Sequence, residues 1–245
     1  MATKIEWTNC VFNPITGCTK ISAACRNCYA ETMAIRLKGM GQEKYKNGFE
    51  VTLHPESLEE PFKWKKPSMV FVCSMGDLFH EKVPFEFIDK VMDVIRRNRQ
   101  HTFQILTKRA ERMEEYFSYV TRPVPANAWL GVTCETPVHY DRVQALQRIE
   151  TSVRFISAEP LLCDVSDIPL DGIHWLITGG ESGVHARPSS IEWFRNLRDY
   201  CIKKKVPFFF KQWGAYGEDG IKRSKYKNGS LLDGVEWKMM PGDEY

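Results

Sequence analysis

Three cysteines near the start of the chain have the side-chain type and the spacing of metal ligands. Cys18, Cys25 and Cys28 are separated by six and then by two residues. Cys25 and Cys28 stand three positions apart at a predicted helix start, so both sulfurs can be directed at one centre, and the longer loop can return Cys18 to it. Thiolates are soft ligands that favour zinc or an iron–sulfur cluster, and the amides of a helix N-terminus favour their negative charge. The loop therefore predicts a metal centre.

The identity of that metal depends on a fourth ligand. A structural zinc site needs four ligands, and only Cys10 is close enough in sequence to complete one, because the nearest histidine is His54. Three cysteines without an evident fourth ligand suit a four-iron cluster whose last iron is open to a substrate or cosubstrate. The residues alone leave both alternatives open.

Length and composition are those of an ordinary globular protein. The chain has 245 residues, of which 43% are hydrophobic, and a formal net charge of +3. No apolar run approaches the roughly 18 residues of a spanning helix, and the first seven residues lack the apolar stretch of a signal peptide, so we expect a cytoplasmic protein with no membrane partner. Eight cysteines are too few for a disulfide scaffold. Cys73 and Cys201 are predicted to be core residues.

From Ser68 onward, short apolar runs alternate with stretches of helical spacing. The predicted strands are 69–73, 102–106, 128–132, 153–157, 173–178 and 206–210. Each run is continuously apolar, as expected for parallel strands covered on both faces. A first strand within 5–13 and a first helix from Tyr29 give six or seven βα units. The pattern predicts an α/β fold, a partial or complete parallel (β/α) barrel of the TIM type over 1–214, with a glycine-rich C-terminal extension over 215–245.

Nearly every predicted strand ends in polar or charged residues. In a barrel these ends converge on one rim, where such enzymes build their sites. In a doubly wound sheet they spread along an edge. We favour the barrel, because six strands that end in polar or charged residues are stronger evidence for a shared rim than any one of them. The residues expected to face one cavity beside the cysteine loop are Asp77, Lys108, Glu135, Glu159 and Glu181.

The cysteine loop followed by Tyr29 resembles the radical S-adenosylmethionine superfamily, in which three cysteines hold a [4Fe-4S] cluster after the first strand of a partial (β/α) barrel. Nearly the whole chain is more closely similar to a phage-associated three-cysteine-motif family of uncharacterised proteins. The segments that carry this likeness are Trp7, 13–14, 17–18, 25–30, 74–79, 106–109, 131–135, 157–161, 179–183 and 208–214.

The resemblance implies an enzyme that binds a [4Fe-4S] cluster and S-adenosylmethionine (AdoMet), and that cleaves AdoMet reductively to a 5′-deoxyadenosyl radical. The reductant would be flavodoxin-like or ferredoxin-like. Two features depart from the superfamily. The first cysteine gap is six residues rather than the usual three, and the Gly-Gly-Glu motif, usually found after the second strand, occurs here as Gly179, Gly180 and Glu181 after a much later one. Asp77 ends the second strand, so which carboxylate binds the AdoMet amino group stays open.

The remaining candidates for AdoMet binding each have a plainer alternative. Tyr29 would lie beside the adenine or simply pack the first helix. Gly179 and Gly180 would let backbone approach the ligand, or form an ordinary turn. Glu135 and Glu159 are candidate rim carboxylates whose alternative role is salt bridging to Lys108, Arg109 or Lys211.

Two function classes follow. The first is the radical enzyme, with a nucleotide or nucleic acid ranked first as substrate because of the phage association and the basic groups at 63–66, 96–99, 203–205 and 222–227. The second is a noncatalytic zinc-stabilised or cluster-stabilised barrel that binds nucleic acid or a companion protein, with Cys10 completing a four-cysteine site. Iron content discriminates between them.

Overall fold

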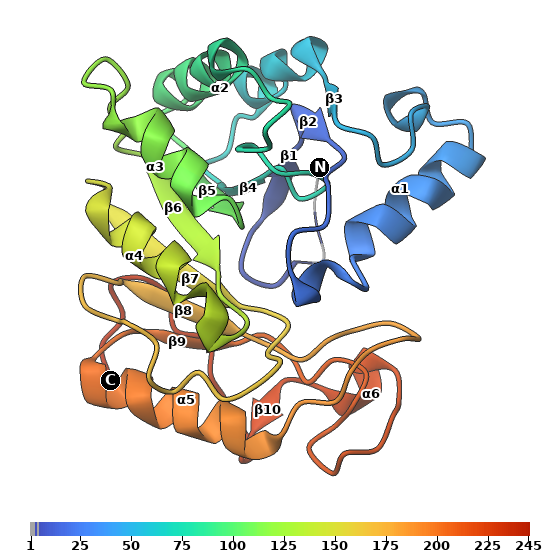
Figure 1. Cartoon of the computed structure of the whole chain (residues 1–245), viewed down its shortest axis with the longest axis vertical. Helices are drawn as coiled ribbons and strands as arrows, with labels where there is room; N and C mark the ends of the chain where they lie inside the picture. The colour runs from blue at the N-terminus through green and yellow to red at the C-terminus, as the bar shows by residue number, and fades with distance from the viewer. Residues whose placement is uncertain (1–2, 4) are drawn as a thin grey trace. The chain divides into compact units, whose positions relative to one another are not determined.

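The computed structural model describes residue 3 and residues 5–245 (Figure 1). By its internal contacts the chain divides into two compact units, 1–131 with 148–152, and 132–147 with 153–245. The predicted division into 1–214 and 215–245 stays a prediction, and residues 1, 2 and 4 of its first part lie outside the described residues. In the part of the chain that the structure describes, no helix is long and apolar enough to cross a membrane.

Seven strands form the main sheet in the order β1-β4-β5-β6-β7-β8-β9. Their bounds are β1 Cys10–Phe12, β4 Met69–Val72, β5 Thr102–Thr107, β6 Ala128–Thr133, β7 Val153–Ala158, β8 Trp175–Thr178 and β9 Phe208–Phe210. The pairs β1–β4, β4–β5, β7–β8 and β8–β9 are parallel. The predicted strand at 206–210 begins late, at Phe208, because Pro207 has no N–H to donate to a neighbouring strand.

Helices follow most strands. Their bounds are α1 Tyr29–Gly39, α2 Phe85–Arg97, α3 Ala110–Ser118, α4 Tyr140–Arg148, α5 Ile191–Lys204 and α6 Lys225–Asn228, with short 3₁₀ turns η1 Ala23–Cys25, η2 Glu43–Tyr45, η3 Pro55–Glu59, η4 Pro61–Lys63 and η5 Pro137–His139. Two small antiparallel pairs join β2 Ile15–Thr16 to β3 Thr52–Leu53 and β10 Leu231–Leu232 to β11 Val235–Glu236. Loop 159–174 connects β7 to β8 without a helix among its residues, all of which are described.

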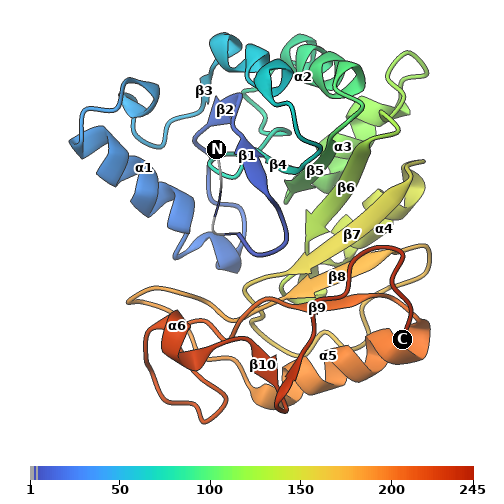
Figure 2. The ribbon, with the colours of Figure 1, turned by 180° about the vertical axis from the view of Figure 1, so that it is seen from behind.

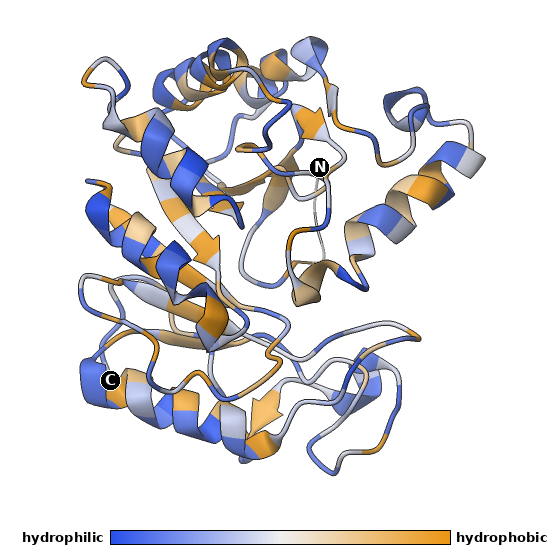
Figure 3. Ribbon diagram, viewed as in Figure 1, coloured by the Kyte–Doolittle hydropathy of each residue, from blue (hydrophilic) through white to orange (hydrophobic). Residues whose placement is uncertain are grey.

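The first unit is built on β4 and β5, with α2 burying one apolar face. Ile88, Val91 and Ile95 are fully buried at the three- and four-residue spacing of a helix stripe (Figure 3). Asn98 directly follows α2 and caps its C-terminus, because its side-chain amide donates to Val94 O at 2.8 Å. Cys73, predicted to be a core residue, is buried immediately after β4.

The second unit packs α5 on β8 and β9. Phe194 and Leu197 of α5 are fully buried, and the Phe194 ring lies 5.1 Å from that of Phe210 in an edge-on arrangement. Ser190 directly precedes α5 and caps its N-terminus, because its hydroxyl accepts from Glu192 N. Cys201, the second predicted core cysteine, is also buried.

Candidate cofactor site

The cysteine loop begins where three stretches of backbone meet. Gly17 N donates to Met75 O at 2.9 Å, and Cys18 N donates to Phe49 O at 3.2 Å. Gly17 has φ of +85°, and a Cβ at this position would stand 2.2 Å from Glu50 O. Only glycine satisfies both the conformation and the space, so this residue fixes where the first cysteine enters the site.

Gly17→Ala is therefore expected to destabilise the protein by more than the conformational cost alone. Gly41→Ala is the matched control, because Gly41 has φ of +71° with nothing within 4 Å of a Cβ. The control should lose about 1–2 kcal/mol, and Gly17→Ala about 1–3 kcal/mol more from the clash. Urea unfolding of the metal-free proteins measures both. Equal losses in the two variants would show that the Glu50 backbone moves aside freely.

The three thiols lie in one neighbourhood. Cys25 ends η1, Cys28 immediately precedes α1, and all three cysteines are partly exposed. Cys25 acts electrostatically on Cys18, and Lys20 interacts with both Cys25 and Cys28. Three thiol donors fit an iron–sulfur cluster chemically. Within the described residues, however, no set of three or more His, Cys, Asp or Glu side chains is gathered closely enough to hold a metal ion.

The surroundings of Cys25 and Cys18 shift the pKa values of the two thiols in opposite directions. Burial raises its pKa, but the charge of Lys108 and hydrogen bonds from Ile21 and Ser22 outweigh burial, and its pKa is lowered overall. Burial, with the charge of Asp77, instead raises the pKa of Cys18 to about 11. Lys108 follows β5, and its charge acts on Cys25 of the cysteine loop.

Arg109 ties the end of β5 to the cysteine loop, and sequence reasoning gave it only a salt-bridging role. Its Nη1 donates to Asp77 Oδ2 at 3.0 Å and to Cys18 Sγ at 3.4 Å. Its Nη2 donates to Thr19 Oγ1 at 2.8 Å and to Thr19 O at 3.3 Å, and its Nε donates to Glu81 at 3.2 Å. The side chain is 5% exposed. Arg109 thus positions the loop through several charge-assisted hydrogen bonds.

Asp77, the carboxylate predicted at the end of the second strand of the repeat, is buried. It accepts from Thr107 Oγ1 at 2.7 Å and from Phe79 N at 3.0 Å, in addition to Arg109. These contacts make it the anchor of Arg109. Binding of a ligand ammonium by the same carboxylate stays a prediction.

Tyr29 is the first residue of α1, and its ring is 59% exposed. Its hydroxyl donates to Ser74 O, while Asn13 Oδ1 accepts from Ser74 Oγ and Met75 N. Whether Tyr29 packs the first helix or faces a ligand stays a prediction. An aromatic ring can stack on a planar ligand.

The predicted carboxylates of the second unit are all paired with cations. Glu135 is fully buried against Arg142 at 3.2 Å, and among the described atoms its Oε1 has no hydrogen-bond partner. Glu159 lies 3.1 Å from Lys211. Lys211 is one of the partners named for the alternative salt-bridging role, whereas Arg142 is not.

Glu181 is paired with Arg187. Arg187 Nη2 donates to Oε1 at 2.6 Å, and Arg187 Nε donates to Oε2 at 2.8 Å. Arg187 N also donates to Oε2 at 2.7 Å, so Arg187 alone gives this carboxylate three hydrogen bonds.

Gly179 and Gly180 permit close approach of protein backbone. A Cβ on Gly180 would stand 1.9 Å from Trp213 O, and one on Gly179 would stand 2.8 Å from Glu159 Oε1. Gln212, which sequence reasoning noted only at a strand end, donates to Gly180 O and accepts from Gly214 N. The second unit therefore brings Glu159, Gly179, Gly180 and Glu181 to the ends of neighbouring strands. Whether all five rim residues face one cavity stays a prediction.

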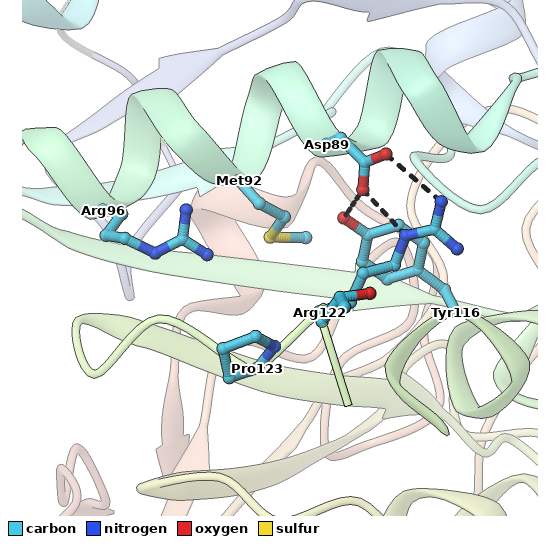
Figure 4. Close-up of a pocket in the computed structure, with 7 residues that line it drawn as sticks. Asp89, Met92, Arg96, Tyr116, Arg122 and Pro123 are labelled. Carbon is cyan, nitrogen blue, oxygen red and sulfur yellow. Dashed lines mark hydrogen bonds and ion pairs between the residues drawn. The ribbon is translucent and has the colours of Figure 1, made fainter. Parts of the chain in front are cut away.

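A separate pocket of about 300 Å³ lies beside α2 (Figure 4). Asp89 points into it and accepts from Tyr116 Oη at 2.7 Å and from Arg122 Nε at 2.9 Å. These side chains satisfy one another, and none of them belongs to the predicted site. We infer that this cluster has a structural role, because it holds Arg122, in the segment after α3, against Asp89 of α2.

Comparison with solved structures defines the class of fold. A cysteine-to-serine mutant of spore photoproduct lyase matches with a TM-score of 0.57 and 10% identity, covering 83% of this chain and 76% of the lyase. A double mutant with bound AdoMet and dinucleoside spore photoproduct matches with a TM-score of 0.50 and 9% identity, over 78% and 60%. A tyrosine-to-phenylalanine mutant matches with a TM-score of 0.50 and 8% identity, over 77% and 72%. The fold is an α/β partial barrel of parallel strands, as predicted.

The chain belongs to the DUF5131 family, described as proteins of unknown function, whose model matches residues 2–241. A search of curated proteins found no match. The predicted membership of an uncharacterised family is confirmed at this level, and the phage association of that family stays a prediction.

Proposed function

We propose that the protein is an iron–sulfur enzyme of the radical S-adenosylmethionine type. The observation that carries the proposal is the hydrogen bond from Arg109, at the end of β5, to the thiol of Cys18, with the charge of the neighbouring Lys108 acting on Cys25. Two cations next to soft thiolate donors favour an anionic cluster at that point of the chain. The likeness of fold to a lyase with bound AdoMet supports the choice of cosubstrate.

Cys18, Cys25 and Cys28 would hold a [4Fe-4S] cluster and leave one iron open to AdoMet. A reduced cluster held by these cysteines would supply the electron for reductive cleavage of AdoMet to methionine and a 5′-deoxyadenosyl radical. Arg109 holds the thiol of Cys18, and Lys108 favours the thiolate of Cys25. The exposed ring of Tyr29 would stack on the adenine.

The strand-end residues would bind the polar groups of AdoMet. Asp77, Glu135, Glu159 and Glu181 are the candidate acceptors for its ammonium, and Lys108 is the candidate cation for its carboxylate. Gly179 and Gly180 set the backbone from which Glu181 projects. We further propose a cytoplasmic location, a flavodoxin-like or ferredoxin-like reductant, and a nucleotide or nucleic acid substrate, with a companion protein as a further partner. The dinucleoside bound by the comparison lyase supports this substrate class.

AdoMet cleavage tests the proposal. After anaerobic reconstitution and reduction, the wild-type protein is expected to convert AdoMet to 5′-deoxyadenosine and methionine, measured by chromatography. Failure of fully loaded protein to cleave AdoMet with several low-potential reductants would contradict it.

Glu181→Gln is expected to weaken AdoMet binding to the loaded protein by about 10- to 150-fold. The change keeps the side-chain size but removes the anion, and a hydrogen bond to a charged group contributes about 1.5–3 kcal/mol. Calorimetry measures the affinity. Arg187→Gln is the control, because it removes the partner of Glu181 and keeps the carboxylate. If both variants lose affinity equally, Glu181 acts through the fold and does not bind the ammonium.

A further inference from the structure

A second pocket, of about 420 Å³, lies between the loop that follows β8 and the segment that follows β9. Ser182 and Val184 line it from the first loop, and Lys222, Ser224 and Lys225 line it from the second. Lys222 Nζ donates to Val184 O at 2.6 Å, which holds the two walls together. Figures 1 and 2 both show the loop after β8 running beside α6. The whole pocket belongs to the second unit.

The charge of this pocket is positive. Between β9 and α6 the acidic residues are Glu218 and Asp219, and both are paired with arginines. Asp219 accepts from Arg223 at 2.8 Å, and Glu218 lies 3.9 Å from Arg195. Across the described residues, no carboxylate comes within salt-bridge distance of Lys222 or Lys225. An uncompensated pair of ammonium groups at the mouth of a pocket attracts an anion.

Aromatic rings accompany both lysines. Lys222 Nζ lies 5.6 Å from the centroid of the Tyr216 ring, and Lys225 Nζ lies 5.3 Å from that of Tyr226. Tyr226 is 75% exposed, and the hydroxyls of Ser182 and Ser224 lie on the pocket walls. Cations alone would suit any polyanion, including an acidic peptide. Cations accompanied by an exposed ring, here that of Tyr226, suit single-stranded nucleic acid, because phosphates meet the cations while a base stacks on the ring.

We propose that this pocket binds the phosphodiester backbone of a single-stranded nucleic acid, with Lys222 and Lys225 contacting phosphates and Tyr226 stacking on a base. The inference rests on the proposed function in that it names the substrate class of the same enzyme. Binding itself requires neither the cluster nor AdoMet, so the two can be tested apart.

The test is the salt dependence of binding to a fluorescent oligothymidylate of about 12 nucleotides, within the range of single-strand site sizes, measured by anisotropy. For single strands, the logarithm of the binding constant falls with the logarithm of the salt concentration, with a slope of about −0.7 for each phosphate neutralised. K222Q/K225Q is expected to reduce the magnitude of the slope by about 1.4. K203Q/K204Q, which removes two exposed lysines from the end of α5 in the same unit, should leave it unchanged. Tyr226→Ala should weaken binding about 5- to 150-fold.

Equal slopes for the two double variants would overturn the inference. So would equally tight competition by a polyglutamate of matched charge, which would point to an acidic protein partner, or retention of full affinity by Tyr226→Ala. AdoMet cleavage is assayed in the same variants without oligonucleotide. If the wild-type protein cleaves AdoMet but does not bind the oligonucleotide, this inference alone is contradicted, whereas binding by a wild-type protein that does not cleave AdoMet contradicts the proposed function alone.

Discussion

Replacing Cys25 by alanine is expected to abolish the formation of 5′-deoxyadenosine from AdoMet. The charge of Lys108 helps to lower the pKa of the Cys25 thiol, which favours the thiolate that binds iron. With two remaining ligands the loop cannot leave a single open iron, and cleavage needs direct coordination of AdoMet. Iron content and deoxyadenosine are measured after identical reconstitution and reduction.

Cys163→Ala is the matched control for this experiment. Cys163 is also a partly exposed free cysteine, but it lies in loop 159–174 of the second unit. It should bind the full complement of iron and cleave AdoMet at the wild-type rate. Persistent cleavage by Cys25→Ala protein would contradict the assigned ligand set.

Arg109→Met is expected to lower the free energy of unfolding of the metal-free protein by about 3–5 kcal/mol, the range for breaking a buried ion pair by removing one partner. The substitution leaves Asp77 charged and buried without its cation, and it removes three hydrogen bonds to Cys18 and Thr19 of the cysteine loop. Asp77→Asn in the same background should restore part of the loss, because it removes the unpaired charge. Urea unfolding measures each variant.

Arg148→Met is the control for Arg109→Met. Arg148 pairs with Glu114 at 2.5 Å, but its side chain is 58% exposed, so its removal should change stability far less. Arg109→Met should also bind less iron than the control, since Cys18 loses its anchor. Equal stability of the two variants would show that Arg109 does not hold the loop in solution.

The alternation of strands and helices was predictable because each strand is a continuous apolar run that parallel sheets require. The positions at which the strands begin and end were less predictable. Pro207 removes a donor and delays β9, and the stretch between β7 and β8 turns back without forming a helix. The apolar pattern carries no information on either point, since both depend on backbone hydrogen bonds.

The candidate site was predictable in its residue types and not in its pairings. The spacing of the cysteines indicated a metal centre, and the ends of apolar runs indicated charged residues. The sequence pattern does not predict three of the pairings. The contact of Arg109 with Cys18 and the approach of Gly180 to Trp213 join residues far apart in the sequence. The pairing of Arg187 with Glu181 depends on side-chain conformation. One signal was present, since Lys108 and Arg109 stand together at the end of a predicted strand.

Metal analysis of anaerobically purified protein tests the central claim most directly. The account predicts about four iron and four sulfide per chain, held through Cys18, Cys25 and Cys28, with an electron paramagnetic resonance signal of a reduced cluster that AdoMet perturbs. Cys10→Ala should leave the iron content unchanged, because the Cys10 thiol lies at Met69 O on the neighbouring strand. One zinc per chain that is lost in Cys10→Ala, with no cluster formed on reconstitution, would contradict the account and favour a noncatalytic four-cysteine module.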